Sequence, residues 1–188
     1  MLTSIAALAT VAFAAPGKCA ATGQVKTVCD PNLNLLGNPQ FLTQPCGGSW
    51  CLSTDSSRIA PWSITSNYKT YEIDPSGTFG AVQGVNSMDL NSDNKVTLGQ
   101  SLKTIAGQTY TLTFSLNQNP CGPSMTKTGF VSAVGTASQP FTISNTATQQ
   151  ISYAFKASSD STLVQIGSTT ESSSCGPVVF NFKVVQGC

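Results

Sequence analysis

The sequence predicts an all-β protein, an antiparallel β-sandwich of the jelly-roll type. Two observations support this class: apolar and polar residues alternate over short segments, and turn-forming residues separate those segments. The clearest segment is 108–117, where large apolar side chains alternate with hydroxyl residues at Tyr110, Leu112, Phe114 and Leu116. Period-two alternation places the large side chains on one face of a strand. One buried and one solvated face is typical of antiparallel sheets.

Several further segments repeat this pattern. Alternation predicts strands at 61–66, 71–74, 88–90, 151–155 and 178–184, with weaker ones at 141–143 and 163–166. In the last strand, one face is expected to carry Val178, Phe180, Phe182 and Val184. Gly, Pro, Asn and Ser form the intervening turns, as at 106–107, 119–123, 158–161 and 175–177. Many short strands separated by turns, without any long segment of helical period, favour a sandwich or jelly roll.

The N-terminus predicts secretion. Residues 1–14 are almost wholly apolar or small and end in Ala12-Phe13-Ala14, the small-x-small pattern of a signal-peptide cleavage site. The apolar run is shorter than the roughly 20 residues that span a bilayer. We therefore expect a signal peptide at 1–14, a cysteine-bearing extension at 15–31 and one sandwich domain at 32–188. The expected location is extracellular or in a cell wall, without a membrane span.

The seven cysteines indicate disulfides, because cysteine thiols of secreted proteins are oxidised in the extracellular environment. Cys121 and Cys175 each begin a Cys-Gly-Pro triplet at a predicted strand end, so we expect them to pair. Cys46 and Cys51 are expected to close a short loop. An odd number leaves one thiol free or available for a disulfide-linked dimer, and the pairing stays open for Cys19, Cys29 and Cys188. A four-thiolate zinc site would need closer spacing.

Composition excludes several functions. The chain has no histidine, which removes Ser-His-Asp triads, Cys-His dyads and zinc-protease motifs. Nine basic and eight acidic residues nearly cancel, and Arg58 is the only arginine. Nucleic-acid binding normally needs a basic stripe, so we expect no nucleic-acid partner. We predict no catalytic residues and no enzymatic activity.

Two groups of oxygen-bearing side chains are candidate sites. Glu72 and Asp74 lie two apart on a predicted strand and share a face. Side-by-side carboxylates would not flank a glycosidic bond from opposite sides, as a glycosidase requires. We therefore expect them to accept hydrogen bonds from sugar hydroxyls or to form a solvated strand face. Asp89, Asn91 and Asp93 alternate as calcium ligands do in loops. They predict either a structural calcium or an Asx-rich turn without a metal. Apart from this calcium, we expect no cofactor.

Four aromatic residues are candidates for stacking on sugar rings. Trp62 and Tyr71 alternate with polar neighbours, a pattern that favours core positions over ligand contact. Trp50, in the cysteine loop, and Tyr68, at a turn, are better candidates for exposure. An exposed loop aromatic is a functional indication.

The ordered motifs resemble an extracellular family, domain of unknown function 642, known best from plant cell walls. The resemblance covers about residues 32–185 and rests on segments 34–41, 61–64, 71–74, 84–91 and 106–116 and on both Cys-Gly-Pro triplets. It implies a galactose-binding-like jelly roll. Members are associated with cell-wall polysaccharides and wall-modifying enzymes, so the implied partner is a wall polysaccharide or wall protein.

These observations favour a secreted, non-catalytic polysaccharide- or cell-wall-binding protein. The alternative is a secreted structural or interaction protein, effector- or adhesin-like, that binds another protein through the extra cysteines. A third hypothesis is a glycan-active enzyme that uses Glu72, Asp74 or Asp89.

Overall fold

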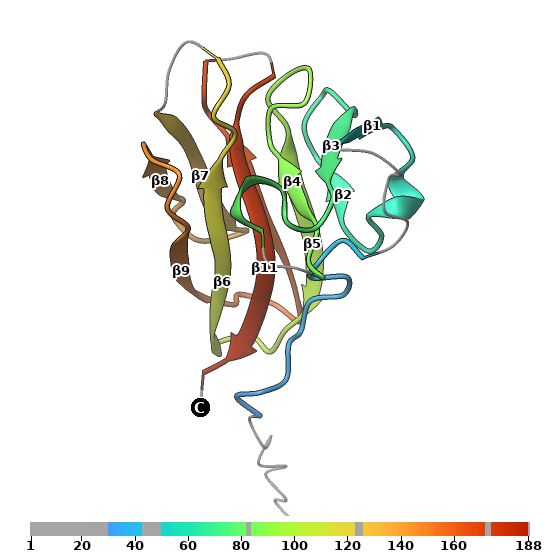
Figure 1. Ribbon diagram of the computed structural model, residues 1–188. Coiled ribbons are helices and arrows are strands. Elements are labelled where there is room, and N and C mark those ends of the chain that lie inside the picture. The colour runs from blue at the N-terminus through green and yellow to red at the C-terminus, as the bar shows by residue number, and fades with distance from the viewer. Residues whose placement is uncertain (1–29, 43–49, 82–83, 123–125, 172–173, 188) are drawn as a thin grey trace, which may run out of the picture.

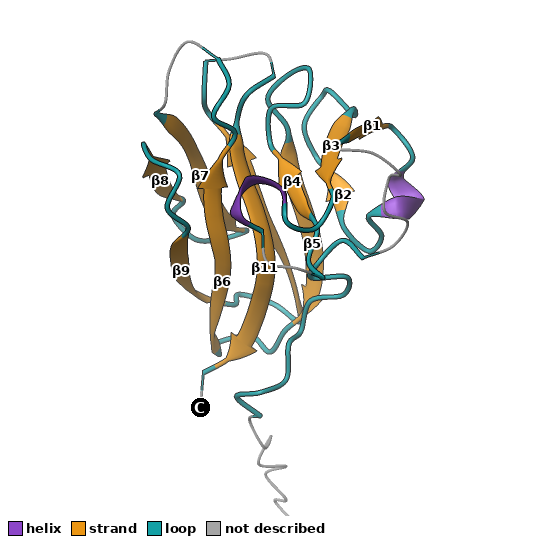
Figure 2. Cartoon of the chain, in the orientation of Figure 1, coloured by secondary structure: helices purple, strands orange, loops and turns teal. Residues whose placement is uncertain are grey.

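Two antiparallel sheets packed face to face form the protein (Figure 1, Figure 2), which confirms the predicted sandwich. The computed structural model describes residues 30–42, 50–81, 84–122, 126–171 and 174–187. The predicted signal peptide and most of the N-terminal extension lie outside these residues. No helix in the described ranges is long and apolar enough to cross a bilayer.

One sheet has six strands and the other has five. The six-stranded sheet has the spatial order β1 (Cys51–Ser53), β3 (Tyr71–Asp74), β4 (Ser87–Asp89), β11 (Pro177–Gln186), β6 (Thr109–Gln118) and β9 (Gln149–Lys156). The five-stranded sheet has the order β2 (Ser63–Ile64), β5 (Thr97–Lys103), β10 (Ser161–Ser168), β7 (Lys127–Ala133) and β8 (Gln139–Ile143). Two short 3-10 helices lie outside the sheets, η1 (Ser56–Arg58) and η2 (Thr78–Gly80).

The core fills the space between the sheets. The four predicted inward residues of β6 are all buried: Tyr110, Leu112, Phe114 and Leu116. Trp62 packs among aromatic rings in tilted arrangements, with ring centroids 6.2 Å from Phe41 and 5.0 Å from Phe182. Its indole N–H donates to the Asn38 carbonyl at 3.1 Å, which satisfies the polar end of a buried tryptophan.

The last strand, β11, breaks the predicted alternation. Its register against β6 shifts between Phe180 and Lys183, and Asn181 has φ of 56°. This irregularity adds a residue and reverses the faces. Phe182 and Val184 join the main core, as predicted, whereas Phe180 belongs to a separate cluster on the outer face. The expectation that all four alternating residues share one face is therefore wrong.

A loop crosses the outer face of the six-stranded sheet. We call it the covering loop; it connects β3 to β4 over residues 75–86 and includes η2, drawn in purple across the sheet in Figure 2. Ala81 and Val85 pack on Phe180 of β11. Gly80 lies against Asn117 of β6 with φ of +82°, a position where a Cβ would collide with the Asn117 side chain. Every residue of β3 and β4, the strands that this loop connects, is buried, so both of their faces are covered.

Candidate ligand-binding pocket

A pocket of about 310 Å³ opens at the end of the six-stranded sheet, beside strands β1, β3 and β4. It combines an apolar wall with a polar one. The apolar wall consists of Trp50, Leu52 and Phe79, and the remaining lining residues are Glu72, Ser92, Asp93, Asn119, Cys121 and Ser174. Apolar surface with a few converging polar groups is the usual composition of a small-ligand site.

Strand register explains how the polar and apolar walls meet. Leu52 of β1 lies opposite Glu72 of β3, and Glu72 lies opposite Asp89 of β4. Cross-strand partners share a face, so these three side chains form a row on the outer face. Leu52 is 40% exposed, whereas Glu72 is 7% exposed and Asp89 is fully buried. The row therefore runs from the pocket mouth into the protein.

Trp50 and Phe79 frame the pocket from two different loops. Trp50 is 56% exposed, a large apolar area for a surface tryptophan. Phe79 belongs to η2 and has φ of 46°, a left-handed conformation that side chains other than glycine rarely adopt. Strained backbone is often found at binding sites. The sequence reasoning missed Phe79, since no alternation marks it; its position between Gly77 and Gly80 was the only available signal.

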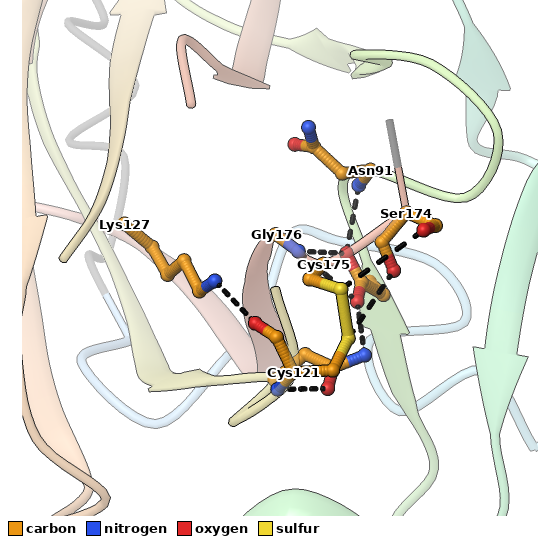
Figure 3. Close-up of a disulfide and its surroundings, with 8 residues drawn as sticks. Asn91, Cys121, Lys127, Ser174, Cys175 and Gly176 are labelled. Carbon is orange, nitrogen blue, oxygen red and sulfur yellow. Dashed lines mark hydrogen bonds between the residues drawn. A yellow bond between two sulfur atoms is a disulfide. The ribbon is translucent and has the colours of Figure 1, made fainter. Parts of the chain in front are cut away.

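A disulfide corner closes one side of the pocket (Figure 3). Cys121 and Cys175 are bonded, as predicted, with their Cα atoms 5.5 Å apart. Next to it, the Asp89 carboxylate accepts from the Gly176 N–H at 3.0 Å and from the Asn119 amide at 2.9 Å. Asn119 in turn accepts from the Cys121 N–H at 3.1 Å. This network ties the two Cys-Gly-Pro turns to β4.

Asp89 also accepts from the Asn91 N–H at 2.7 Å, so its oxygens serve protein donors. Burial raises its pKa, and the hydrogen bonds from Asn119, Asn91 and Gly176 oppose that rise. Asp93 projects at the exposed pocket wall. Within the described ranges, no group of three His, Cys, Asp or Glu residues is placed to hold a metal ion. The geometry favours the Asx-rich turn, and the calcium at Asp89, Asn91 and Asp93 stays a prediction.

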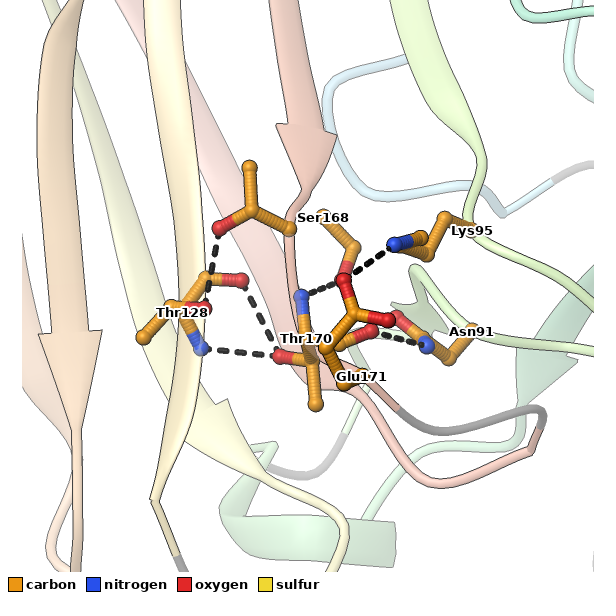
Figure 4. A network of polar contacts seen from close by, with 7 residues as sticks. Asn91, Lys95, Thr128, Ser168, Thr170 and Glu171 are labelled. Atoms are coloured by element: carbon orange, nitrogen blue, oxygen red, sulfur yellow. Dashed lines mark hydrogen bonds and ion pairs between the residues drawn. The ribbon is translucent and has the colours of Figure 1, made fainter.

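A second polar network supports the turn that carries Asp93 (Figure 4). The Asn91 amide donates to the Thr170 carbonyl at 3.2 Å. The Thr170 hydroxyl accepts from the Thr128 N–H at 2.8 Å and donates to the Thr128 carbonyl at 3.0 Å. Lys95 forms an ion pair with Glu171, with 2.6 Å between the lysine Nζ and the glutamate Oε1.

Glu72 and Asp74 form a second carboxylate environment, on the same face of β3. Asp74 is fully buried, and neither of its carboxylate oxygens has a hydrogen-bond donor; the facing hydroxyl of Ser87 is also without a partner. Burial and the neighbouring carboxylates raise the pKa of Asp74 to about 8. Burial, together with the charges of Asp89 and Asp93, raises the pKa of Glu72 to about 7. A proton shared between the two acids would supply the missing donor.

The structure separates the four candidate aromatics. Trp62 and Tyr71 are 2% and 1% exposed, and the Tyr71 hydroxyl donates to the Asp55 carbonyl at 2.5 Å. Both side chains belong to the core cluster, and neither lines the pocket beside β1, β3 and β4. Tyr68 is 57% exposed but does not line the pocket. Trp50 is the one predicted aromatic that does.

The remaining cysteine predictions are only partly described. Cys51 is disulfide-bonded, and its predicted partner, Cys46, lies outside the described residues. Cys19, Cys29 and Cys188 lie outside them as well.

Known proteins share this fold. The carbohydrate-binding module TmCBM61, solved in complex with β-1,4-galactotriose, superposes with a TM-score of 0.53 at 16% identity, covering 82% of this chain and 99% of that one. The arabinose-bound MgGH51 α-L-arabinofuranosidase superposes with a TM-score of 0.54 at 17% identity, covering 81% of this chain and 26% of that one. At these identities the likeness shows the fold alone.

Sequence comparison gives the family. No curated protein sequence matches the chain. Residues 34–185 match the model of the family described as "protein of unknown function (DUF642)", in agreement with the resemblance carried by the strand motifs and the two Cys-Gly-Pro triplets. The match spans most of the chain, which therefore belongs to this family.

Proposed function

We propose that this protein is a secreted, non-catalytic polysaccharide-binding protein whose ligand site is the pocket beside β1, β3 and β4. The main observation is the exposed Trp50 at the edge of a pocket that also presents carboxylate, amide and hydroxyl groups. Pyranose rings pack their C–H faces on aromatic surface, and their hydroxyls bond to such polar groups. The fold shared with a galactotriose-binding module supports the same class of ligand.

Three features support the secreted and non-catalytic parts of the proposal. The predicted signal segment and the Cys121–Cys175 disulfide suit an oxidising, extracellular location. Asp74 is fully buried and cannot contact a bound glycan. Asp89 is buried and occupied by protein donors. Of these three acids, only Glu72, at the pocket wall, could contact a glycan.

Pull-down of the purified mature protein on insoluble cellulose, chitin, β-glucan and pectin tests the proposal. We expect retention on at least one polysaccharide and its loss in Trp50→Ala. Tyr68→Ala is a matched control, because it removes an equally exposed aromatic outside the pocket. Equal losses in the two variants would contradict the assignment of the site. The absence of any retention would instead favour a protein partner.

A parallel assay for new reducing ends tests the absence of catalysis. We expect no release of sugars from the polysaccharide that the protein retains. Release that disappears in Glu72→Gln would overturn the non-catalytic assignment.

A further inference from the structure

The pocket has an unusual charge composition. Glu72 and Asp93 line it, and Asp74 and Asp89 lie behind Glu72 on the same sheet face. The lining, as far as the described residues show it, contains neither lysine nor arginine. The nearby Lys95 is paired with Glu171. Buried Lys127 lies behind the lining, where it donates to the Cys121 carbonyl at 2.8 Å and its charge acts on Asp89. The pocket therefore has negative charge without a positive group in its wall.

Glu72 is the group that a ligand would reach. Only 7% of Glu72 is exposed, yet this residue contributes to the pocket surface. Its charged neighbours are all acids: Asp74 on β3, Asp89 on β4 and Asp93 in the following turn. The β1 residue facing it is Leu52, which is apolar. The charged groups around Glu72 therefore include no cation.

A second observation concerns Asp74, which lies behind Glu72 and outside the pocket lining. Both oxygens of fully buried Asp74, and the hydroxyl of Ser87 opposite, have no hydrogen-bond partner. Buried polar atoms in folded proteins are nearly always satisfied, and exceptions often mark functional sites. A single cationic group at Glu72 would offset the accumulated charge of this carboxylate cluster.

We propose that the pocket selects glycans with a protonated amino sugar, with the ammonium group at Glu72 and the sugar ring on Trp50. This inference rests on the proposed function and specifies its ligand class. An ammonium has three donors and one positive charge, which match a carboxylate wall. An N-acetylated sugar loses the charge, and a uronic acid would place another anion beside Glu72 and Asp93.

The experiment compares two ligands that differ only in this group. Affinities of the full mature protein for glucosamine oligomers and for N-acetylglucosamine oligomers of equal length are measured by calorimetry near neutral pH. We expect the amino form to bind at least about tenfold more tightly, the effect of one charge-assisted hydrogen bond. We expect added salt to reduce the difference.

Two variants that each replace an acid by its amide test whether the preference for the amino form depends on Glu72. Glu72→Gln should abolish the preference for the amino form and retain weak binding of the N-acetyl form. Asp160→Asn is the control, because Asp160 is an exposed acid in the β9–β10 turn, at the strand ends remote from Asn119. If Glu72→Gln does not fold, Asp93→Asn replaces it, and the preference should fall severalfold.

Other binding results would overturn either the amino-sugar inference or the proposed function. Binding of the N-acetyl form or of polygalacturonate in preference to the amino form would overturn the inference and leave polysaccharide binding intact. A preference that Glu72→Gln leaves unchanged would also overturn it. Binding that requires added calcium would assign the carboxylates to a metal instead. Binding of none of these glycans, nor of the wider polysaccharide panel, would contradict the proposed function itself.

Discussion

Two buried carboxylate regions lie on neighbouring strands of the same sheet, and they differ in their donors. At the disulfide corner, Asp89 accepts from Asn91, Asn119 and Gly176. One strand away, Asp74 accepts from no donor, and its nearest charged neighbour is Glu72. Asp74 and Asp89 are both fully buried, so the two regions differ in the number of hydrogen-bond donors that each carboxylate receives.

This difference assigns separate roles. A buried carboxylate with several N–H donors holds chain segments together, and its loss leaves those donors unpaired. A buried carboxylate without donors costs stability at neutral pH, and such groups are frequent at functional sites. We therefore regard the disulfide corner as the support of the pocket, and Glu72, which lines the pocket, as the member of the pair that takes part in the proposed binding.

Removal of the disulfide tests the support most strongly. Cys121→Ser with Cys175→Ser opens a link between residues 54 apart in sequence. On the chain-entropy model we expect the free energy of unfolding to fall by about 4 kcal/mol, measured by equilibrium denaturation. Polysaccharide retention should fall as well, because Asn119 and Ser174 line the pocket beside these cysteines. A fall below about 1 kcal/mol would show that the corner is held without the disulfide.

Asp89→Asn tests the satisfied carboxylate. The amide has one acceptor oxygen and turns its NH₂ group toward a donor, so either the Asn91 N–H or the Asn119 amide loses its partner. We expect a loss of about 2–3 kcal/mol in the free energy of unfolding, as for an unpaired buried donor. A neutral result in denaturant melts would mean that the hydrogen bonds at Asp89 do not stabilise the corner.

Much of the fold follows from local pattern. The period-two alternation of β6 identified its inward residues because β9 pairs with it in unbroken register from Thr109 to Leu116. The same reasoning was wrong for Phe180, because the irregularity at Asn181 reverses the faces of β11. Nothing in the sequence around Asn181 distinguishes an added residue from regular pairing, since both leave apolar residues at alternate positions.

The site was less accessible to sequence reasoning. Spacing placed Glu72 and Asp74 on one face, but that face could be solvated or covered. The covering loop decides the matter: it contributes Phe79 to the pocket beside Glu72, and its Gly80 fits against Asn117, a residue 37 positions away in the sequence numbering. Trp50 was identified from its loop position, whereas Phe79 and Asn119 become pocket residues only through tertiary structure.

Asp74→Asn should act in the opposite direction to Asp89→Asn. The substitution removes a like charge beside Glu72 and provides an amide donor where no donor exists. We expect the free energy of unfolding at neutral pH to rise by about 1 kcal/mol. The two variants make the same chemical change on adjacent strands, so each is the other's control. Equal destabilisation by both would refute the distinction between the two regions.

The smallest expected effect is the pH dependence of the melting temperature. The folded-state pKa values of Glu72 and Asp74 are raised from 4.5 and 3.8 to about 7 and about 8. Between the unfolded and folded values the native state holds more protons than the unfolded chain, so stability falls as pH rises. We expect the melting temperature to fall by a few degrees between about pH 5 and pH 9.

The double variant Glu72→Gln/Asp74→Asn isolates this pair. It should remove most of the pH dependence above about pH 5, and what remains should come from Asp89, whose pKa burial also raises. Thermal melts monitored by circular dichroism across this range measure both proteins under the same conditions. A wild-type melting temperature that rises with pH would mean that the pair is ionised at low cost, as a satisfied carboxylate is. In that case the Glu72–Asp74 region would resemble the disulfide corner, and it would need no cation from a ligand.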